Sequence, residues 1–334
     1  MSLVVVIALS APATAAAAEP YEWAALGDSD TTGVFVGEPR PALGSSDRDG
    51  CDRTANSYPD LVDRDLAGFP LDRPVRLTDV SCAGATIDHV VRSEQKPMSP
   101  VDPPADGWPA VEPQATRAGL GEATDVVTIG IGGNSLPLGD IVLDCLELGL
   151  RQQSCREHHE NPPDGAEGID AKLQRVRDEY ARMLADVHDL APNAEVIAVG
   201  YPTICPRAAS TCEFGDLTRL GTIRADDIAW LSEVVDRINR IMSTVSSSFG
   251  DHYVDLASST ADRHVCRPAG EKWVEGLCGD AEDFWPARVA VPGAAALDCR
   301  VVGKRATLVH PNAAGHANAA SHVGAAVRRA LLEP

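Results

Sequence analysis

The sequence has little lysine and little positive charge of any kind. Four of its 29 basic residues are lysine, and 49 acidic residues leave a formal net charge of −20 at pH 7. Because so acidic a chain repels the phosphate backbone of nucleic acids, we expect no nucleic-acid partner. No Cys-x-x-Cys motif occurs among the nine cysteines, which argues against a structural zinc site.

Long apolar segments are also missing, except at the N-terminus. Residues 2–9 are an apolar run, and small residues, mostly alanine, follow it as far as Glu19. This pattern is typical of the hydrophobic and cleavage regions of a secretory signal, without the positively charged start. We therefore expect residues 1–19 to be a signal peptide truncated at its beginning, with an ordered strand as the alternative. The run is too short for a transmembrane helix, so we expect no stable membrane insertion.

The cysteine content indicates an exported, disulfide-bonded protein. Nine cysteines are many for a cytosolic enzyme, and together with the signal they predict secretion. Cys51 and Cys82 bracket a strand–helix unit, whereas Cys145 and Cys155 close a short loop, so we expect both pairs to be bonded. The other five should form two bridges and leave one free thiol, with the pairing open: Cys205, Cys212, Cys266, Cys278 and Cys299.

Apolar periodicity divides the rest of the chain into alternating strands and helices. Short apolar runs predict strands at 22–26, 74–80, 124–134, 194–200 and 252–256. Helical spacing covers 57–66, 136–148, 169–190, 222–246 and 310–332, and the Gly- and Pro-rich stretches 95–113 and 258–306 predict loops. This alternation indicates an α/β fold with a parallel sheet and helices on both faces. Without a repeat or a dividing linker, residues 20–334 should form one domain, which we expect to be a monomer.

Small polar residues follow the first three predicted strands. Gly27-Asp28-Ser29 ends the first strand, Gly84 follows the second, and Asn134 ends the third. In an open α/β sheet, ligands bind at the carboxyl ends of the strands. Ser29 is therefore a candidate nucleophile. The alternative is that Asp28 and Ser29 only cap the next helix.

A serine, a histidine and nearby hydrogen-bond donors are what acyl transfer requires. A neutral imidazole can take the serine proton during attack near pH 7, and His310 stands just before the last helix. The tetrahedral oxyanion needs preorganised donors such as backbone N–H groups and an Asn amide. Losing one such donor typically costs about 2.7–4 kcal/mol of barrier.

In this order, the motifs resemble those of the SGNH (GDSL-type) hydrolase family. Gly27-Asp28-Ser29 looks like block one, Gly84 like the block-two glycine, Gly132-Gly133-Asn134 like block three, and His310-Pro311 like block five. The resemblance spans nearly the whole chain after the signal and is greatest to secreted actinobacterial lipases and esterases.

This resemblance implies a fold, a site and a reaction. The fold would be a flavodoxin-like three-layer α/β/α sandwich, and no cofactor or metal is implied. Ser29 would be the nucleophile and His310 the general base, with an oxyanion hole from the Ser29 N–H, the Gly84 N–H and Asn134. The expected substrate is a small-molecule or lipid ester.

The sequence departs from the family pattern at three positions. Asp30 replaces the Tyr often found after the nucleophile, and we expect its carboxylate to face water, because an inward charge would disfavour the oxyanion. Ser135 stands where Asp is usual. Thr307 stands three residues before the histidine, where the family often has the Asp that orients the imidazole. These departures support one other hypothesis, a non-catalytic binding protein that retains the fold, although the intact Ser29, Gly84, Asn134 and His310 set argues against it. A carbohydrate acetylesterase is the alternative among enzymes.

The missing Asp predicts a Ser–His dyad rather than a triad. An imidazole acting as base needs an acceptor for its other N–H. We expect that acceptor to be a main-chain carbonyl near Arg305–Thr307, with Asp298 as an outside candidate for an acid.

The remaining polar clusters have simpler interpretations. His158-His159 could bind a metal, but an exposed loop pair is the better interpretation. The acidic group of Asp280, Glu282 and Asp283 fits a solvated loop better than a calcium site. Three tryptophans either line the acyl or leaving-group side or pack in the core: Trp108, Trp273 and Trp285.

Overall fold

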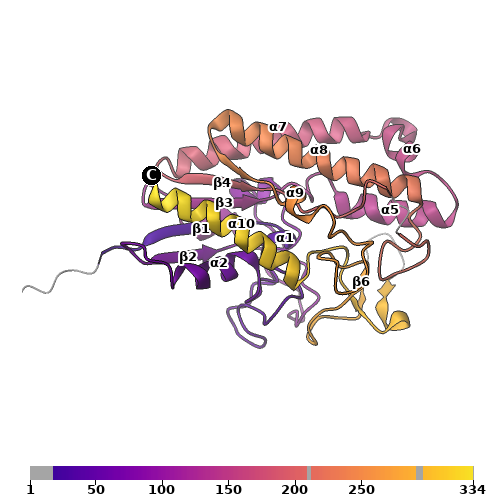
Figure 1. The fold of residues 1–334 in the computed structure, drawn as a ribbon, viewed down its shortest axis with the longest axis horizontal. Coiled ribbons are helices and arrows are strands. Elements are labelled where there is room, and N and C mark those ends of the chain that lie inside the picture. The colour runs from indigo at the N-terminus through magenta and orange to yellow at the C-terminus, as the bar shows by residue number, and fades with distance from the viewer. Residues whose placement is uncertain (1–17, 209–211, 291–295, 334) are drawn as a thin grey trace, which may run out of the picture.

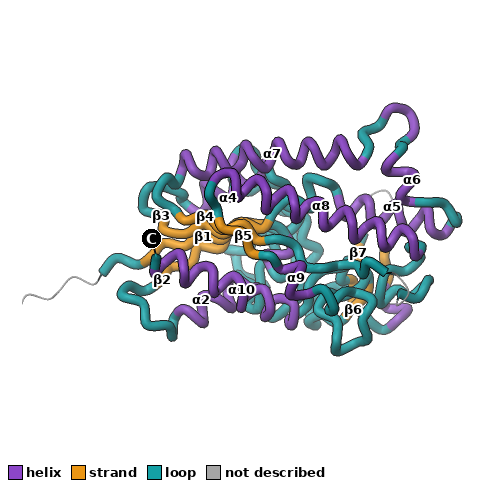
Figure 2. The backbone as a smooth tube through the Cα atoms, turned by 45° about the horizontal axis from the view of Figure 1, so that its top comes forward, coloured by secondary structure: helices purple, strands orange, loops and turns teal. Residues whose placement is uncertain are grey.

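A parallel five-stranded sheet forms the centre of the protein. The computed structural model describes residues 18–208, 212–290 and 296–333, so residues 1–17 of the expected signal peptide lie outside the described residues. The strands are β1 (Tyr21–Gly27), β2 (Val75–Asp79), β3 (Thr124–Gly130), β4 (Glu195–Val199) and β5 (His252–Val254). Their order is β2-β1-β3-β4-β5, the order of flavodoxin-like sheets (Figure 2). The predicted α/β fold is thus confirmed. The strand order reverses between β1 and β3, where such sheets bind their ligands.

Helices cover both faces of this sheet (Figure 1). On one face lie α7 (Ile169–Leu190) and α8 (Ala225–Phe249), and on the other lie α2 (Tyr58–Leu66) and α10 (Ala313–Leu332). Successive residues of a strand point to opposite faces. Leu26 of β1 therefore packs into the core under α7 and α8, whereas Trp23 packs into the core with α2 and α10. One short apolar strand thereby joins both layers.

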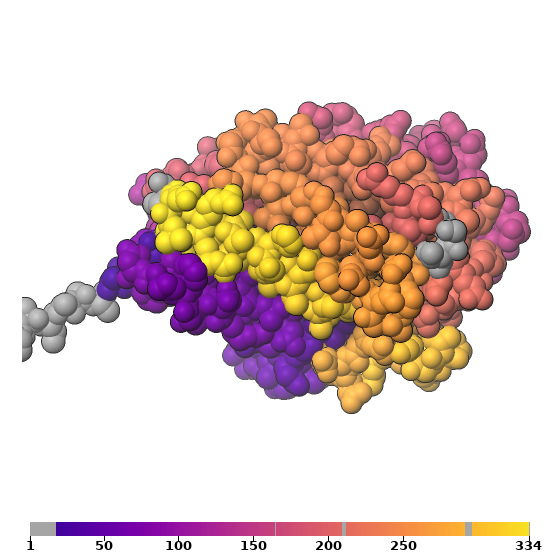
Figure 3. Space-filling model, viewed as in Figure 1, coloured from indigo at the N-terminus to yellow at the C-terminus, as the bar shows by residue number. Residues whose placement is uncertain are grey.

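The last helix lies beside elements from distant parts of the chain. Figure 3 shows α10 in yellow between the purple N-terminal region that holds α2 and the orange segment that holds α9 (Leu256–Thr260). Asn312 caps this helix, because its side-chain oxygen accepts hydrogen bonds from the backbone N–H groups of Ala314 and Gly315. The helix therefore begins at Ala313, three residues after its predicted start, and its docking fixes the position of His310.

Short elements complete the fold around the sheet. The expected long helix after β3 is α5 (Leu138–Leu150), which begins and ends two residues later than predicted. The other short helices are α1 (Ser29–Thr32), α3 (Asp88–Val91), α4 (Gln114–Ala118), α6 (Cys155–Glu160), η1 (Pro163–Gly165) and η3 (Cys299–Val302). The stretch predicted as irregular holds two antiparallel pairs, β6 (Cys278–Gly279) with β9 (Arg305–Ala306), and β7 (Arg288–Val289) with β8 (Leu297–Asp298).

Four disulfides lie within the described part of the chain. Cys51–Cys82 and Cys145–Cys155 are the two pairs expected from the sequence, and Cys212–Cys266 and Cys278–Cys299 are the two further bridges. Cys205 is buried and free, and burial raises the pKa of its thiol to about 12. A buried thiol of such high pKa is unreactive, so Cys205 serves in packing.

Two glycines of α5 provide a matched test of the packing. A side chain at Gly149 would place its Cβ 1.9 Å from the Thr222 carbonyl oxygen, whereas one at Gly139 would meet nothing within 4 Å. We predict that Gly149→Ala lowers the free energy of unfolding by about 1–3 kcal/mol, because backbone must move to relieve the overlap. Gly139→Ala should leave it unchanged or raise it by up to about 1 kcal/mol. Denaturant unfolding without reductant measures both, and equal effects of the two variants would contradict the packing.

Candidate active site

Ser29 lies at the carboxyl end of the central strand β1. The chain turns there through Gly27, where a Cβ would come within 2.1 Å of Thr31 Oγ1 and 2.7 Å of the Gly130 carbonyl oxygen. The Asp28 side chain then caps α1 by accepting a hydrogen bond from the Asp30 N–H. Ser29 is the first residue of that helix, with its hydroxyl free for another partner. The capping interpretation therefore applies to Asp28, and Ser29 remains available for chemistry.

His310 contacts Ser29 directly. Its Nε2 lies 2.8 Å from Ser29 Oγ, and its Nδ1 lies 3.0 Å from the main-chain oxygen of Thr307. This network assigns the proton to Nδ1, which donates to the carbonyl, and leaves Nε2 to accept the serine proton. Burial lowers the pKa of His310, so the ring is neutral at pH 7.

The acceptor for His310 is a carbonyl, as the sequence led us to expect. No hydrogen bond joins the ring to a carboxylate among the described residues. Asp298, the outside candidate for an acid, bonds to the Arg300 guanidinium instead and caps η3. The Thr307 hydroxyl is buried and donates to the Gly276 carbonyl oxygen at 2.8 Å, so only the main chain of Thr307 serves the imidazole.

The loop before His310 is held in an unusual conformation. Leu308 and Val309 have φ values of 49° and 63°, the left-handed region that residues other than glycine rarely adopt, and β-branched residues such as valine least of all. Such residues cost of order 1–3 kcal/mol each and persist only where neighbours hold them. Here the Val309 N–H donates to the Gly276 carbonyl, and the Glu275 N–H donates to the His310 carbonyl. This backbone pairing turns the Thr307 carbonyl back toward the ring.

Unused hydrogen-bond donors lie at the ends of β1, β2 and β3. The N–H groups of Ser29 and Gly84 donate to no acceptor in the described chain. Gly84 has a φ of 78°, a conformation that glycine adopts without strain. The Asn134 side-chain amide donates to the Ala85 carbonyl oxygen at 2.9 Å, which orients the amide and leaves its second N–H free. All three expected oxyanion donors therefore lie at the same edge of the sheet as Ser29.

Tyr201 also lies at this site, and the sequence analysis did not predict it. Its hydroxyl donates to Asp28 Oδ2 at 2.5 Å and accepts from the Gly133 N–H at 2.8 Å. The Asn239 side chain holds the Tyr201 backbone through two hydrogen bonds, to its N–H and its carbonyl. The available signal was Gly200-Tyr201-Pro202, another polar turn at the end of a buried strand, β4. Tyr201 thereby links Asp28, the residue before Ser29, to Gly133, the residue before Asn134.

Asp30 is half-buried and turns one carboxylate oxygen away from water, contrary to our expectation. Its Oδ1 is shielded from solvent and has no hydrogen-bond partner among the described residues. The side chain lines a small pocket with Tyr58, Tyr201 and His316, because α1 turns the residue after Ser29 toward α2 and α10. Burial raises the pKa of Asp30 and also that of its neighbour Asp28 above the usual range of carboxyl groups.

The departure at Ser135, where the family usually has Asp, also has a structural explanation. Ser135 is buried, and its hydroxyl oxygen accepts a hydrogen bond from the Ile87 N–H at 2.9 Å. A neutral hydroxyl thus connects the block-three turn to the segment that follows Gly84. This contact places no charge beside the Gly84 N–H and the Asn134 amide.

The other polar clusters lie apart from these residues. Asp280 pairs with Lys304 and Asp283 with Arg305, so these carboxylates are used in surface ion pairs. Trp285 is buried and packs edge-on against Phe35, which in turn contacts the His310 ring edge-on. The pair His158-His159 is not an exposed loop pair, because it lies in α6 and His159 is buried.

A serine hydroxyl bonded to a histidine, with free donors beside it at a sheet edge, is the arrangement of serine-type acyl hydrolases. The comparisons with known proteins agree with this class. The chain belongs to the GDSL-like lipase/acylhydrolase family, whose model matches residues 25–317. This confirms the resemblance drawn from the sequence, and the protein is an ester hydrolase of that family.

Relatives of the same kind occur in Streptomyces. The chain is 28% identical to "Lipase 2" of Streptomyces coelicolor over 79% of each chain. It is 27% identical to "Esterase" of Streptomyces scabiei over 83% of this chain and 82% of the relative. The crystal structure of phospholipase A1 from Streptomyces albidoflavus NA297 superposes with a TM-score of 0.59 at 19% identity, over 93% of this chain and 99% of that one. That likeness shows a shared fold.

The environment of His310 predicts how kcat/KM falls at acidic pH. Because burial lowers the pKa of His310, the neutral base persists below 6.5, the usual value for histidine. We predict that kcat/KM falls on acidification with a midpoint below 6.5, measured with an ester that carries no ionisable group. Asp298→Asn should give the same profile, since Asp298 bonds to Arg300. A midpoint above 6.5, or a loss of several orders of magnitude in Asp298→Asn, would contradict this site.

Proposed function

We propose that this protein hydrolyses carboxylic esters through an acyl-enzyme formed on Ser29. The observation that carries the proposal is the 2.8 Å contact between Ser29 Oγ and His310 Nε2. In the first step Oγ attacks the ester carbonyl carbon, and Nε2 takes the hydroxyl proton. The tetrahedral oxyanion accepts hydrogen bonds from the Ser29 N–H, the Gly84 N–H and the Asn134 amide.

The same histidine completes both halves of the reaction. The tetrahedral intermediate collapses, the C–O bond to the alcohol breaks, and the imidazolium returns its proton to the departing oxygen. Water then attacks the acyl-enzyme while Nε2 accepts its proton, and collapse releases the acid and restores the Ser29 hydroxyl. The Thr307 carbonyl keeps the proton on Nδ1 throughout, so Nε2 is the atom that exchanges protons.

Apolar side chains beside the site favour esters with an apolar acyl or alcohol chain. Met98 is 74% exposed, and its Cε would lie 3.4 Å from a Cβ built on Gly84. Leu308 is 37% exposed and stands two residues before His310. Exposed apolar groups at a site mark contact with apolar ligands. Lipid-like esters therefore fit the site better than acetylated sugars.

We place this activity outside the cytoplasm. Four disulfides are typical of exported proteins. The signal-like segment at residues 1–19 supports the same location. Among the helices of the described residues, none combines the length and the apolar character that crossing a bilayer requires.

Removing the nucleophile tests the mechanism directly. We predict that Ser29→Ala abolishes ester hydrolysis and labelling by a fluorophosphonate, because no other hydroxyl contacts His310 Nε2 in the described structure. Circular dichroism and unfolding should match the wild type, since the Ser29 side chain is only part-buried. Labelling of the wild type also separates an enzyme from a binding protein that retains the fold. Full turnover in Ser29→Ala would remove Ser29 from the mechanism.

A chain-length series tests the substrate class. We predict that kcat/KM of the wild type is higher for octanoyl or longer esters than for acetyl esters. Met98→Ser should lower kcat/KM for the long esters about tenfold, the value of one or two buried methylenes, and leave acetyl esters nearly unchanged. Met98 is exposed, so folding should be unaffected. Preferred turnover of acetylated xylan over all long-chain esters would instead support a carbohydrate acetylesterase.

A further inference from the structure

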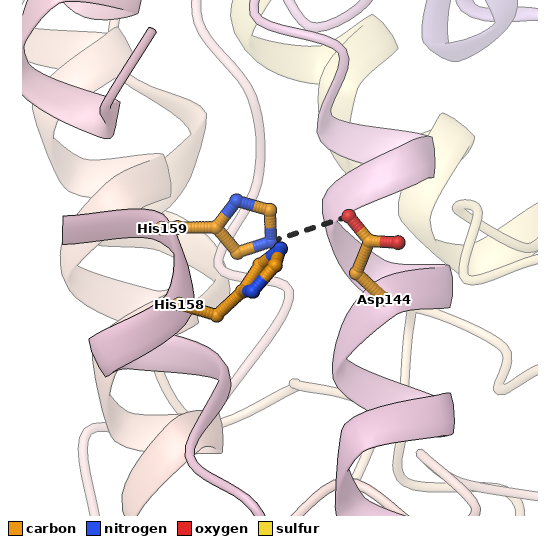
Figure 4. Close-up of side chains that lie close together, drawn as sticks. All are labelled: Asp144, His158 and His159. Carbon is orange, nitrogen blue, oxygen red and sulfur yellow. Dashed lines mark ion pairs between the residues drawn. The ribbon is translucent and has the colours of Figure 1, made fainter. Parts of the chain in front are cut away.

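Three potential metal ligands meet between α5 and α6, and the proposed mechanism uses none of them. Asp144 projects from α5, and His158 and His159 project from α6 (Figure 4). One side-chain ligand atom from each residue lies within 4.8 Å of the others. His159 Nε2 lies 3.5 Å from Asp144 Oδ2.

His159 supplies an independent sign of a missing partner. The residue is 5% exposed, and its ring stacks on Trp230 with centroids 5.8 Å apart and planes inclined by 8°. Its Nε2 is buried and makes no hydrogen bond within the described residues. Leaving a buried polar nitrogen without a partner costs about 1–3 kcal/mol. Figure 4 shows this nitrogen directed toward Asp144 and His158, so a ligand held between the three residues would satisfy it.

We propose that Asp144, His158 and His159 bind one divalent transition-metal ion of the zinc class. Two imidazoles and one carboxylate are a ligand set that zinc accepts, with metal–ligand distances of about 2.0–2.2 Å. At such distances, neighbouring ligands of a tetrahedral ion are about 3.3 Å apart. The 3.5 Å pair already fits this spacing.

Asp144 and His158 have room to move closer to a shared ion. Asp144 has a side chain that is 48% exposed, and His158 is half-buried, so both can rotate by the ångström or so that closure requires. The fourth position would be open to water. Hard cations such as Mg²⁺ and Ca²⁺ prefer oxygen ligands only, and a site with two imidazoles disfavours them.

The site is preorganised by bonds that do not involve the ligands. The disulfide Cys145–Cys155 joins α5 to α6 beside Asp144 and three residues before His158. Ser154 caps α6 by accepting from the Glu157 N–H, and Asp227 Oδ1 accepts from the Arg156 N–H at 3.0 Å. These contacts hold both helices in place before any ion binds, which lowers the entropy cost of binding.

A bound ion would act on structure rather than on ester chemistry. The α5 helix begins at Leu138, four residues after the oxyanion residue Asn134. An ion between α5 and α6 would restrain this helix hairpin. The reaction itself uses Ser29 and His310, so the metal site and the ester hydrolase mechanism can be tested separately.

The test is a metal titration of the untagged full chain with its disulfides intact. After removal of metal by chelation, Zn²⁺ is titrated by calorimetry and Co²⁺ by visible absorption. We expect one ion per chain and the intense d–d bands of tetrahedral Co²⁺, with millimolar Ca²⁺ unable to compete. Asp144→Asn and His158→Gln should each weaken Zn²⁺ binding at least about tenfold, and both positions are exposed enough to leave the fold intact.

A surface histidine provides the matched control. His252 lies 3.9 Å from the Glu195 carboxylate, with both side chains nearly half exposed, and no third ligand completes a cluster there among the described residues. His252→Gln should therefore bind Zn²⁺ as the wild type does. Absence of one-to-one binding, unchanged affinity in Asp144→Asn and His158→Gln, or an equal loss in His252→Gln would each overturn the proposal.

Discussion

The hydrogen bond between Ser29 and His310 joins residues 281 positions apart, and much of the fold is needed to form it. Ser29 is fixed by β1, the strand that pairs with both β2 and β3. His310 is fixed by the docking of α10 against α2 and α9, and by backbone pairing with residues 275–277. A shift of about 1 Å in either support would cost catalysis heavily, since proton transfer requires heavy-atom contacts of about 2.6–3.2 Å.

A second set of contacts braces the strand ends that carry the site. Tyr201 bonds to Asp28 on one side and to the Gly133 N–H on the other, and Asn239 fixes its backbone. The Ser29 turn after β1 is thereby linked to the Asn134 turn after β3 by a side chain from the end of β4. Every member of this network has its hydrogen-bond partners, which is the condition under which a buried polar network adds rigidity.

The strand ends that carry the site could be predicted, because each is marked by a local sequence pattern. The backbone conformation before His310 and the orientation of the Asp30 side chain could not be predicted, because both depend on distant segments. Apolar runs followed by Gly and small polar residues located Ser29, Gly84 and Asn134, and the absence of an Asp at Thr307 correctly indicated a carbonyl acceptor. The left-handed conformation of Leu308 and Val309 depends on pairing with a segment about 30 residues earlier. The Asp30 side chain likewise lies in a pocket formed with α2 and α10, so the sequence near residue 30 cannot predict its orientation.

Asp28 and the half-buried Asp30 are the acidic groups beside this site, which has no acid bonded to His310. Two neighbouring buried carboxyl groups do not both ionise readily, so one tends to keep its proton. Asp28 receives hydrogen bonds from Tyr201 and from the Asp30 N–H, which favour its charged form, whereas Asp30 Oδ1 has no such partner in the described chain. Burial therefore raises the pKa of both carboxyl groups, and only Asp28 has hydrogen bonds that oppose this rise. Burial lowers the pKa of His310, and a charge on Asp28 opposes this by raising it, the direction in which a triad carboxylate acts on the imidazolium.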